Sequence, residues 1–181
     1  MSLERKSPND LVQKALSELG TVAEARAAKL KAEVEANLPD VAVEPQQIFH
    51  VFSNLVSNAA KYSRPGGEIL LTAKRDDDGV RFSVIDHGPG IPLQYQPRMF
   101  EKFFRIPGTD SHGAGLGLAI TREIVAAHDG RVGVNSQPGK GSEFYFVLPA
   151  AEPSIHPANR GQRSHEKRIL IVDDERNVRM M

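Results

Sequence analysis

The 181-residue chain contains no cysteine and has no excess charge of either sign, because 23 lysine and arginine residues balance 23 aspartate and glutamate residues. Without cysteine there are no disulfides, thiol nucleophiles or thiolate metal ligands. The balanced charge gives no indication of a nucleic acid or an anionic membrane as partner. We therefore expect a cytoplasmic chain that acts on a small ligand or a neutral partner.

Long apolar runs are also lacking. No segment approaches the ~20 apolar residues of a membrane-spanning helix, and Met1-Ser2-Leu3-Glu4 lacks the apolar core of a signal peptide, so we expect no direct membrane contact. The length favours one domain of about 150 residues with an additional tail. By composition, residues 1–7 are expected to be an N-terminal remnant or expression scar, 8–149 the main domain and 150–167 a linker.

Hydrophobic periodicity and turn residues predict a mixture of helices and strands. Ser7-Pro8 is typical of a helix start, and the segment 76–79, Asp-Asp-Asp-Gly, indicates a hairpin between two β-type runs. Residues 39–45 are expected to form a turn between two prolines. The expected elements are, in order, a helix over 8–23, a strand over 30–36, a helix over 46–62, strands over 68–74 and 80–86, a helix over 116–128, and strands over 131–136 and 142–148.

The helix over 46–62 separates polar from apolar side chains. At about 100° per residue, one stripe holds Gln47, His50, Asn54, Asn58 and Lys61, and the other holds Ile48, Phe52, Leu55, Ala59 and Tyr62. Periodicity alone favours an amphipathic helix with a solvated polar face. The two asparagines, however, offer amide oxygens that suit Mg²⁺, and Lys61 can hold a phosphate one turn further on. The polar stripe therefore also fits a magnesium–triphosphate.

The strand over 80–86 ends in a carboxylate, Asp86, which is followed by Gly88 and Gly90. Alternating glycines are typical of a tight turn, and they also let the backbone approach a ligand closely. Asp86 can accept a hydrogen bond from the exocyclic amino group of adenine, whereas guanine presents a carbonyl at that position. A nucleotide pocket at this strand end would prefer ATP.

A second glycine-rich segment, residues 112–118, runs directly into the helix over 116–128. A helix start supplies free backbone N–H groups and a positive dipole end for phosphate oxygens. Alone this is weak evidence, because such a segment also occurs in flexible loops. The Rossmann alternative requires a buried strand before it, which residues 100–110 do not resemble.

Four segments together resemble the N, G1, F and G2 boxes of sensor histidine kinases. They are, in this order, Asn54–Ser63, Asp86–Ile91, Phe100–Arg105 and Gly113–Leu118. The resemblance covers roughly residues 8–149, and four ordered boxes make a chance match improbable. The same nucleotide fold is shared with gyrase, heat-shock chaperone and mismatch-repair ATPases. The resemblance implies an α/β two-layer sandwich of the Bergerat type, a mixed sheet of about five strands packed under three helices.

The resemblance also implies roles for individual residues. Asn58 would be the principal Mg²⁺ ligand and Asn54 a second contact to metal or phosphate, while Lys61 and Arg105 would contact phosphate. These are the expected catalytic residues. Asp86 would bind the adenine amino group. The full set of residues implied to contact ATP, besides those above, is Tyr62, Asp86, Gly88, Gly90, Ile91, Phe104, Gly113, Gly115, Leu116, Gly117 and Leu118.

Residues 106–112 would form a short lid over the nucleotide. Two positions depart from the family pattern: His50 stands where relatives often have glutamine, and Ala114 where they often have threonine. The change at Ala114 should perturb the lid slightly without removing backbone donors. His50 permits a nucleotide contact, but a plain surface histidine is the favoured explanation.

The resemblance implies transfer of the γ-phosphate of ATP to a histidine on a separate helical dimerisation domain. The hydrolases of this fold carry a glutamate where this chain has Asn54, and an amide cannot activate water as a general base. Two alternatives stay open, a nucleotide-binding regulatory module and an ATPase. The histidine that accepts the phosphate is expected to lie outside this chain, since none of the chain's own histidines has the sequence context of a phosphoacceptor. These histidines are His50, His87, His112, His128, His156 and His165.

The segment 167–175 resembles the first strand and acidic pair of a response-regulator receiver. An apolar strand followed by Asp173 and Asp174 is a suitable half-site for Mg²⁺, although a generic charged tail would give the same letters. Residues 168–181 are therefore expected to be the truncated start of a receiver, which would make the parent a hybrid kinase. The expected partners are the histidine-bearing dimerisation domain and a receiver, with neither nucleic acid nor membrane.

Overall fold

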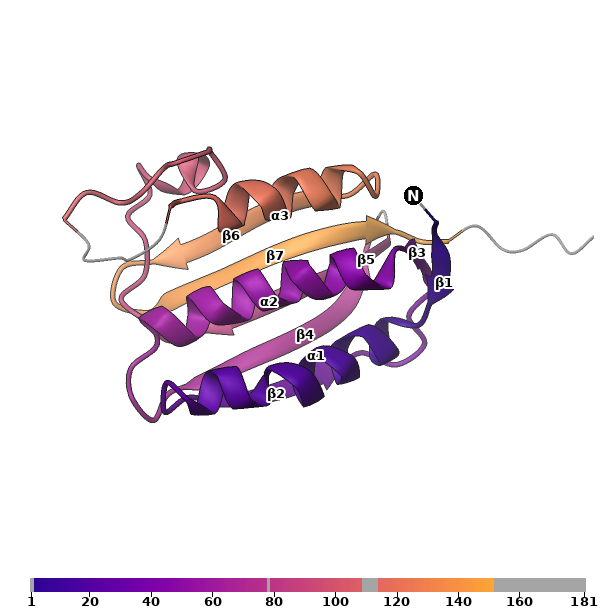
Figure 1. The fold of residues 1–181 in the computed structure, drawn as a ribbon, viewed down its shortest axis with the longest axis horizontal. Helices are drawn as coiled ribbons and strands as arrows, with labels where there is room; N and C mark the ends of the chain where they lie inside the picture. The colour runs from indigo at the N-terminus through magenta and orange to yellow at the C-terminus, as the bar shows by residue number, and fades with distance from the viewer. Residues whose placement is uncertain (1, 78, 109–113, 152–181) are drawn as a thin grey trace, which may run out of the picture. The chain divides into compact units, whose positions relative to one another are not determined.

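The structure, a computed structural model, describes residues 2–77, 79–108 and 114–151. Its elements are shown in Figure 1 and are, in chain order, β1 (Glu4–Lys6), α1 (Pro8–Glu24), β2 (Lys29–Val34), β3 (Val41–Val43), α2 (Pro45–Tyr62), β4 (Glu68–Asp76), β5 (Gly79–Asp86), the 3-10 helix η1 (Gln96–Arg98), α3 (Gly117–Ala126), β6 (Arg131–Gln137) and β7 (Gly141–Pro149).

Five of the strands form one mixed sheet in the order β2-β4-β5-β7-β6. β2 runs parallel to β4, and the other neighbours are antiparallel. Figure 1 shows the three helices on one side of this sheet, where α1 packs on β2 and β4, α2 on β4 and β5, and α3 on β6 and β7. The predicted two-layer α/β sandwich with three helices and five strands is confirmed.

The helices begin where the sequence signals place them. Ser7 is extended and precedes Pro8 at the first position of α1, while Pro45 opens α2 in the same way. A proline fits there because the first helical N–H groups have no partner inside the helix. α3 ends at Ala126, two residues before the predicted end, and in the turn that follows Asp129 adopts φ 56° and the N–H of Gly130 donates to the carbonyl of Val125 at 3.0 Å.

The core lies between α2 and the middle of the sheet. The ring of Phe52 packs edge-on against those of Phe82 and Phe146, with centroids 5.8 and 5.3 Å away, and the latter two rings stack at 5.0 Å. These aromatic contacts stabilise α2 on β5 and β7. The predicted apolar stripe is thus buried along most of α2, but Tyr62 at its end is 41% exposed.

His128, just after α3, connects α3 to the start of α2. Its Nε2 accepts a hydrogen bond from the backbone N–H of Glu44 at 3.0 Å, so Nδ1 carries the proton and donates to the carbonyl of Ile124 at 2.8 Å. The side chain is only 3% exposed. A neutral histidine therefore provides an acceptor for an N–H at the beginning of α2, where a helix cannot supply one.

A second, two-stranded sheet was not predicted. β1 pairs antiparallel with β3, and Val41 of β3 also forms a bridge with Ala150 on its other side. The expectation of a simple turn over residues 39–45 was wrong, because a three-residue strand lies between the two prolines. Strands of this length are too short to give a period-two signal. The proposed receiver segment, 168–181, lies outside the described residues.

Candidate functional site

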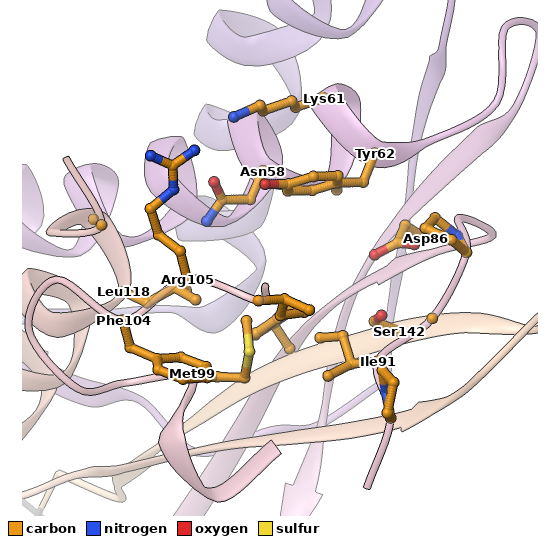
Figure 2. Close-up of a pocket in the computed structure, with 18 of the residues that line it drawn as sticks. Asn58, Lys61, Tyr62, Asp86, Ile91, Met99, Phe104, Arg105, Leu118 and Ser142 are labelled. Carbon is orange, nitrogen blue, oxygen red and sulfur yellow. The ribbon is translucent and has the colours of Figure 1, made fainter. Parts of the chain in front are cut away.

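A cavity of about 510 Å³ lies between the second half of α2, the chain that follows β5 and the start of α3. Its size suits a small-molecule ligand. Most of the residues predicted from sequence line it, namely Asn58, Lys61, Tyr62, Asp86, Gly90, Ile91, Phe104, Arg105, Gly115, Leu116, Gly117 and Leu118. Two predicted residues, Asn54 and Gly88, do not, and Gly113 lies outside the described residues. Figure 2 shows how the labelled side chains surround the space.

Asp86 forms one end of the cavity. Its side chain is 5% exposed, and its Oδ1 accepts a hydrogen bond from the N–H of Gly88 at 2.8 Å. Burial raises the pKa of the Asp86 carboxyl above its ordinary value, while the backbone N–H groups of Gly88 and Ser142 and the nearby charge of His87 oppose this rise. The buried carboxylate offers an acceptor to a ligand that brings a donor.

Gly88 and Gly90 are needed because the chain after Asp86 packs closely on its surroundings. A Cβ at Gly88 would lie 2.7 Å from the carbonyl oxygen of Tyr62. Gly90 adopts φ 72°, and a Cβ there would lie 2.1 Å from the carbonyl oxygen of Gln137. Any larger residue would move this wall of the cavity.

The other end of the cavity is polar and basic. Figure 2 shows Asn58, Lys61 and Tyr62 on α2, with the side chain of Arg105 extending toward Asn58 from the opposite wall. α3 begins here at Gly117, and among the described residues no side chain caps its N-terminus. The free N–H groups and positive dipole of this helix start suit an anion, as do the two cationic side chains.

Asn54 lies one turn before Asn58 but contacts protein instead of the cavity. Its Nδ2 donates to the carbonyl of Gly117 at 3.3 Å. This bond joins α2 to the first residue of α3. Asn54 therefore positions the two helix segments that border the basic end of the cavity, and it is not among the residues that line the cavity.

The segments 100–105 and 114–118 pack against each other through the backbone. Phe103 adopts φ 63°, is 70% exposed, and donates its N–H to the carbonyl of Gly115 at 3.0 Å. A Cβ at Gly115 would lie 3.0 Å from the Phe103 backbone. The left-handed conformation costs a non-glycine residue about 1 kcal/mol or more. The next residue, Phe104, lines the cavity, and the guanidinium carbon of Arg98 lies 4.3 Å from the centre of its ring.

Eight cavity residues were not among the predicted site residues: Ala59, Pro89, Pro92, Met99, Ile106, Ala114, Ser142 and Phe144. Ser142 and Phe144 belong to β7 and reach the site because Asp86 pairs with Ser142 in the antiparallel register of β5 and β7. The signal available was the glycine pair around Lys140, which begins the last strand. Pairing that strand with the one that ends at Asp86 would have placed Ser142 beside the carboxylate.

Comparison with known proteins identifies the family of this chain. A family model described as "Histidine kinase-, DNA gyrase B-, and HSP90-like ATPase" matches residues 43–152. The chain belongs to this family. A sensory kinase, SasA, and the catalytic domain of the histidine kinase ThkA are similar to it, so within the family it is a histidine-kinase ATP-binding catalytic domain. Along the described residues of the kinase domain, no helix has both the length and the apolar character needed to cross a membrane.

Two curated relatives are sensor proteins. The alginate biosynthesis sensor protein KinB of Pseudomonas aeruginosa is 42% identical over 140 residues, which cover 77% of this chain and 23% of KinB. The adaptive-response sensory kinase SasA of Crocosphaera subtropica is 43% identical over 123 residues, which cover 67% of this chain and 32% of SasA. The chain thus spans only 23% and 32% of the length of these two relatives.

Solved structures are similar too. Full-length ShkA in complex with AMPPNP superimposes with a TM-score of 0.72 and 35% identity, over 83% of this chain and 32% of ShkA. The catalytic domain of the histidine kinase ThkA superimposes with a TM-score of 0.71 and 26% identity, over 83% of this chain and 97% of that domain. The kinase domain therefore has the fold of histidine-kinase catalytic domains.

Proposed function

We propose that this domain binds Mg-ATP and transfers its γ-phosphate to a histidine on a separate helical dimerisation domain, as part of a two-component sensor kinase. The observation that carries the proposal is the polarity of the cavity. It has a buried carboxylate at one end, Asp86, and a cluster of an amide, two cations and a helix start at the other. Because its substrate is ATP, we place its activity in the cytoplasm.

The carboxylate end suits adenine. Asp86 accepts from the backbone N–H groups of Gly88 and Ser142, and because each carboxylate oxygen has two lone pairs it can also accept from an amino group. Ile91 and Phe144 supply apolar surface next to it. The complex of the similar kinase ShkA with AMPPNP supports an adenine nucleotide as the ligand of this family member.

The opposite end suits a magnesium-bound triphosphate. Mg²⁺ commonly takes one or two protein oxygens together with phosphate oxygens and water, and the amide of Asn58 lines the cavity beside Lys61 and Arg105. The residues present therefore fit the metal, which would neutralise the transferring phosphoryl group. Arg105 and the N-terminus of α3 would hold the phosphate oxygens. Asn54 would act on this end through its bond to Gly117.

Transfer, and not hydrolysis, is favoured by Asn54. Related hydrolases resemble one another in having glutamate there, and a carboxylate can take a proton from water. In this chain the amide of Asn54 donates to the carbonyl of Gly117. It is engaged as a donor and has no basic group to offer, so the nucleophile has to be supplied by another domain.

The proposal predicts phosphate transfer to a partner and almost none to water. The chain is incubated with Mg²⁺, γ-labelled ATP and a separately produced histidine-bearing helical hairpin, with a histidine-free hairpin as control. We expect label on the first hairpin only, in a bond stable to alkali and lost in acid. Rapid phosphate release by the chain alone would instead indicate an ATPase. Nucleotide binding without transfer to any of several cognate hairpins would indicate a regulatory module.

A receiver domain is proposed to follow the kinase domain, with 150–167 as linker and 168–181 as its start. Support comes from the apolar run and the acidic pair of the segment 167–175, which lies outside the described residues. The parent would then be a hybrid kinase. The parent gene should encode, beyond Met181, two further apolar strands with an aspartate at the end of the second. A stop codon or an unrelated domain there would contradict this part of the proposal.

A further inference from the structure

Both polar groups of the Ile91 backbone are held by side chains from elsewhere in the fold. The N–H of Ile91 donates to the Oγ of Ser136 at 2.8 Å, and its carbonyl accepts from the Nε2 of Gln96 at 2.9 Å. Gln96 begins η1, and Ser136 lies in β6 at the edge of the sheet. Neither residue lines the cavity, whereas Ile91 does and is 6% exposed.

Gln96 joins the two sides of this arrangement. Its Nε2 also donates to the carbonyl of Ser136 at 2.8 Å, so one amide nitrogen donates a hydrogen bond to each of two carbonyls. Because both neighbours are carbonyl acceptors, the amide nitrogen of Gln96 has to face them. The flipped amide would place its oxygen against the two carbonyl oxygens. Gln96 therefore couples Ile91 to β6 directly.

Ser136 continues the connection toward the carboxylate end of the cavity. Its Oγ lies 2.8 Å from the carbonyl oxygen of Gly141 and 2.9 Å from the Oγ of Ser142. Ser142 lines the cavity and pairs with Asp86 across β5 and β7. One hydroxyl thus contacts the wall that carries Ile91 and the strand that lies beside Asp86.

We propose that Gln96 and Ser136 are positioning residues that fix the gap between Ile91 and Asp86 and thereby set the affinity for the base of the nucleotide. The inference rests on the proposed nucleotide site. The base would bind between the apolar side chain of Ile91 and the acceptor oxygen of Asp86. Gln96 and Ser136, which lie outside the cavity, would fix the distance between these two groups. Preorganisation of this kind raises affinity because the wall need not be ordered on binding.

The effect on kinetics distinguishes positioning of the base from a general role in stability. The base does not react, so its contacts are the same in the ground state and the transition state. Loosening them should raise KM for ATP and leave kcat unchanged. A residue that served only to keep the domain folded would reduce the amount of active protein, which lowers the apparent kcat without changing KM.

The test compares Gln96→Met, Ser136→Ala and Ser136→Thr with wild type, using ATP titrations by calorimetry and KM and kcat in the hairpin transfer assay. Gln96→Met keeps length and removes both donors, and we expect about ten-fold weaker ATP binding and a matching rise in KM. Ser136→Ala should weaken binding several-fold, and Ser136→Thr, which keeps the hydroxyl, should restore it. Gln94→Met is the matched control, since Gln94 is exposed two residues away.

Because both side chains hold the backbone of one residue, Ile91, the double variant Gln96→Met with Ser136→Ala should lose less than the product of the single losses. Wild-type affinity in Gln96→Met, a fall in kcat at constant KM, or a threonine variant as weak as the alanine variant would each overturn the proposal. The Ser136 pair keeps it testable if Gln96→Met lowers the stability of the domain. Failure of wild type itself to bind ATP would instead refute the proposed function.

Discussion

Replacement of Asp86 by asparagine is expected to weaken ATP binding by about 100-fold or more while changing the free energy of unfolding at neutral pH by no more than about 1 kcal/mol. The carboxylate has two accepting oxygens, and the N–H of Gly88 already uses Oδ1. An amide has one oxygen and one donor group. Either the Gly88 N–H or the adenine amino group would then face a donor in a buried site, which is costlier than the loss of a hydrogen bond alone.

Stability should respond differently from binding. Burial is the largest influence on Asp86 and raises the pKa of its carboxyl, so the folded protein holds the proton at pH values where the unfolded chain has lost it. Between the ordinary pKa of aspartate and this raised pKa, stability contributed by Asp86 falls as pH rises, and above it the penalty is complete. Asparagine removes this penalty but also weakens the bonds from Gly88 and Ser142, and the two effects oppose each other.

ATP titrations at several pH values check the assignment. Protonation of Asp86 removes an acceptor, so the affinity of wild type should fall as pH drops through a pKa above that of an ordinary aspartate. The asparagine variant lacks this step, and the ratio of the two affinities should shrink toward acid pH. Asp10→Asn, an exposed change in the first turn of α1, serves as control. An asparagine variant with wild-type affinity at neutral pH would remove Asp86 from the site.

Much of this site could be predicted because its signals are local. The polar residues near the end of α2 and the glycines at the start of α3 are each recognisable from a few neighbouring residues. Both groups line the cavity in the structure. The contacts of Asn54 and Ser142 could not be predicted in the same way. Asn54 bonds to Gly117, 63 residues away, and Ser142 reaches Asp86 only through the register of β5 and β7. Periodicity fixes which face a residue occupies and carries no information about the partner opposite.

Tyr62 illustrates a related limit. Helical spacing places it with Phe52 and Ala59, both of which are buried, but it is the last residue of α2 and is 41% exposed while it lines the cavity. Helical spacing gives the side of the helix on which a residue lies, and it does not show whether the core still covers that side at the helix end. The strands β1 and β3 could not be predicted for another reason. They are too short to show a periodic pattern, and they are held by pairing with each other.

Replacement of Asn58 by alanine is expected to abolish the effect of Mg²⁺ on ATP affinity and to lower phosphate transfer by about 100-fold or more. The reason is its place at the cationic end of the cavity, beside Lys61 and Arg105, where its amide oxygen would hold the metal. Alanine has no oxygen to replace it. The fold should tolerate the change, because Asn58 is half-buried within α2 and alanine is the better helix former.

The measurement is ATP affinity with and without Mg²⁺, together with the melting temperature. Wild type should bind more tightly with the metal, whereas Asn58→Ala should bind with one low affinity in both conditions. Ser57→Ala changes the exposed neighbour on the same helix and should behave as wild type. If Asn58→Ala keeps the Mg²⁺ dependence, the metal is held elsewhere, and Asn54 becomes the next candidate. Its Nδ2 donates to the carbonyl of Gly117 while its Oδ1 is the atom that would bind a metal, so metal binding there can keep this hydrogen bond.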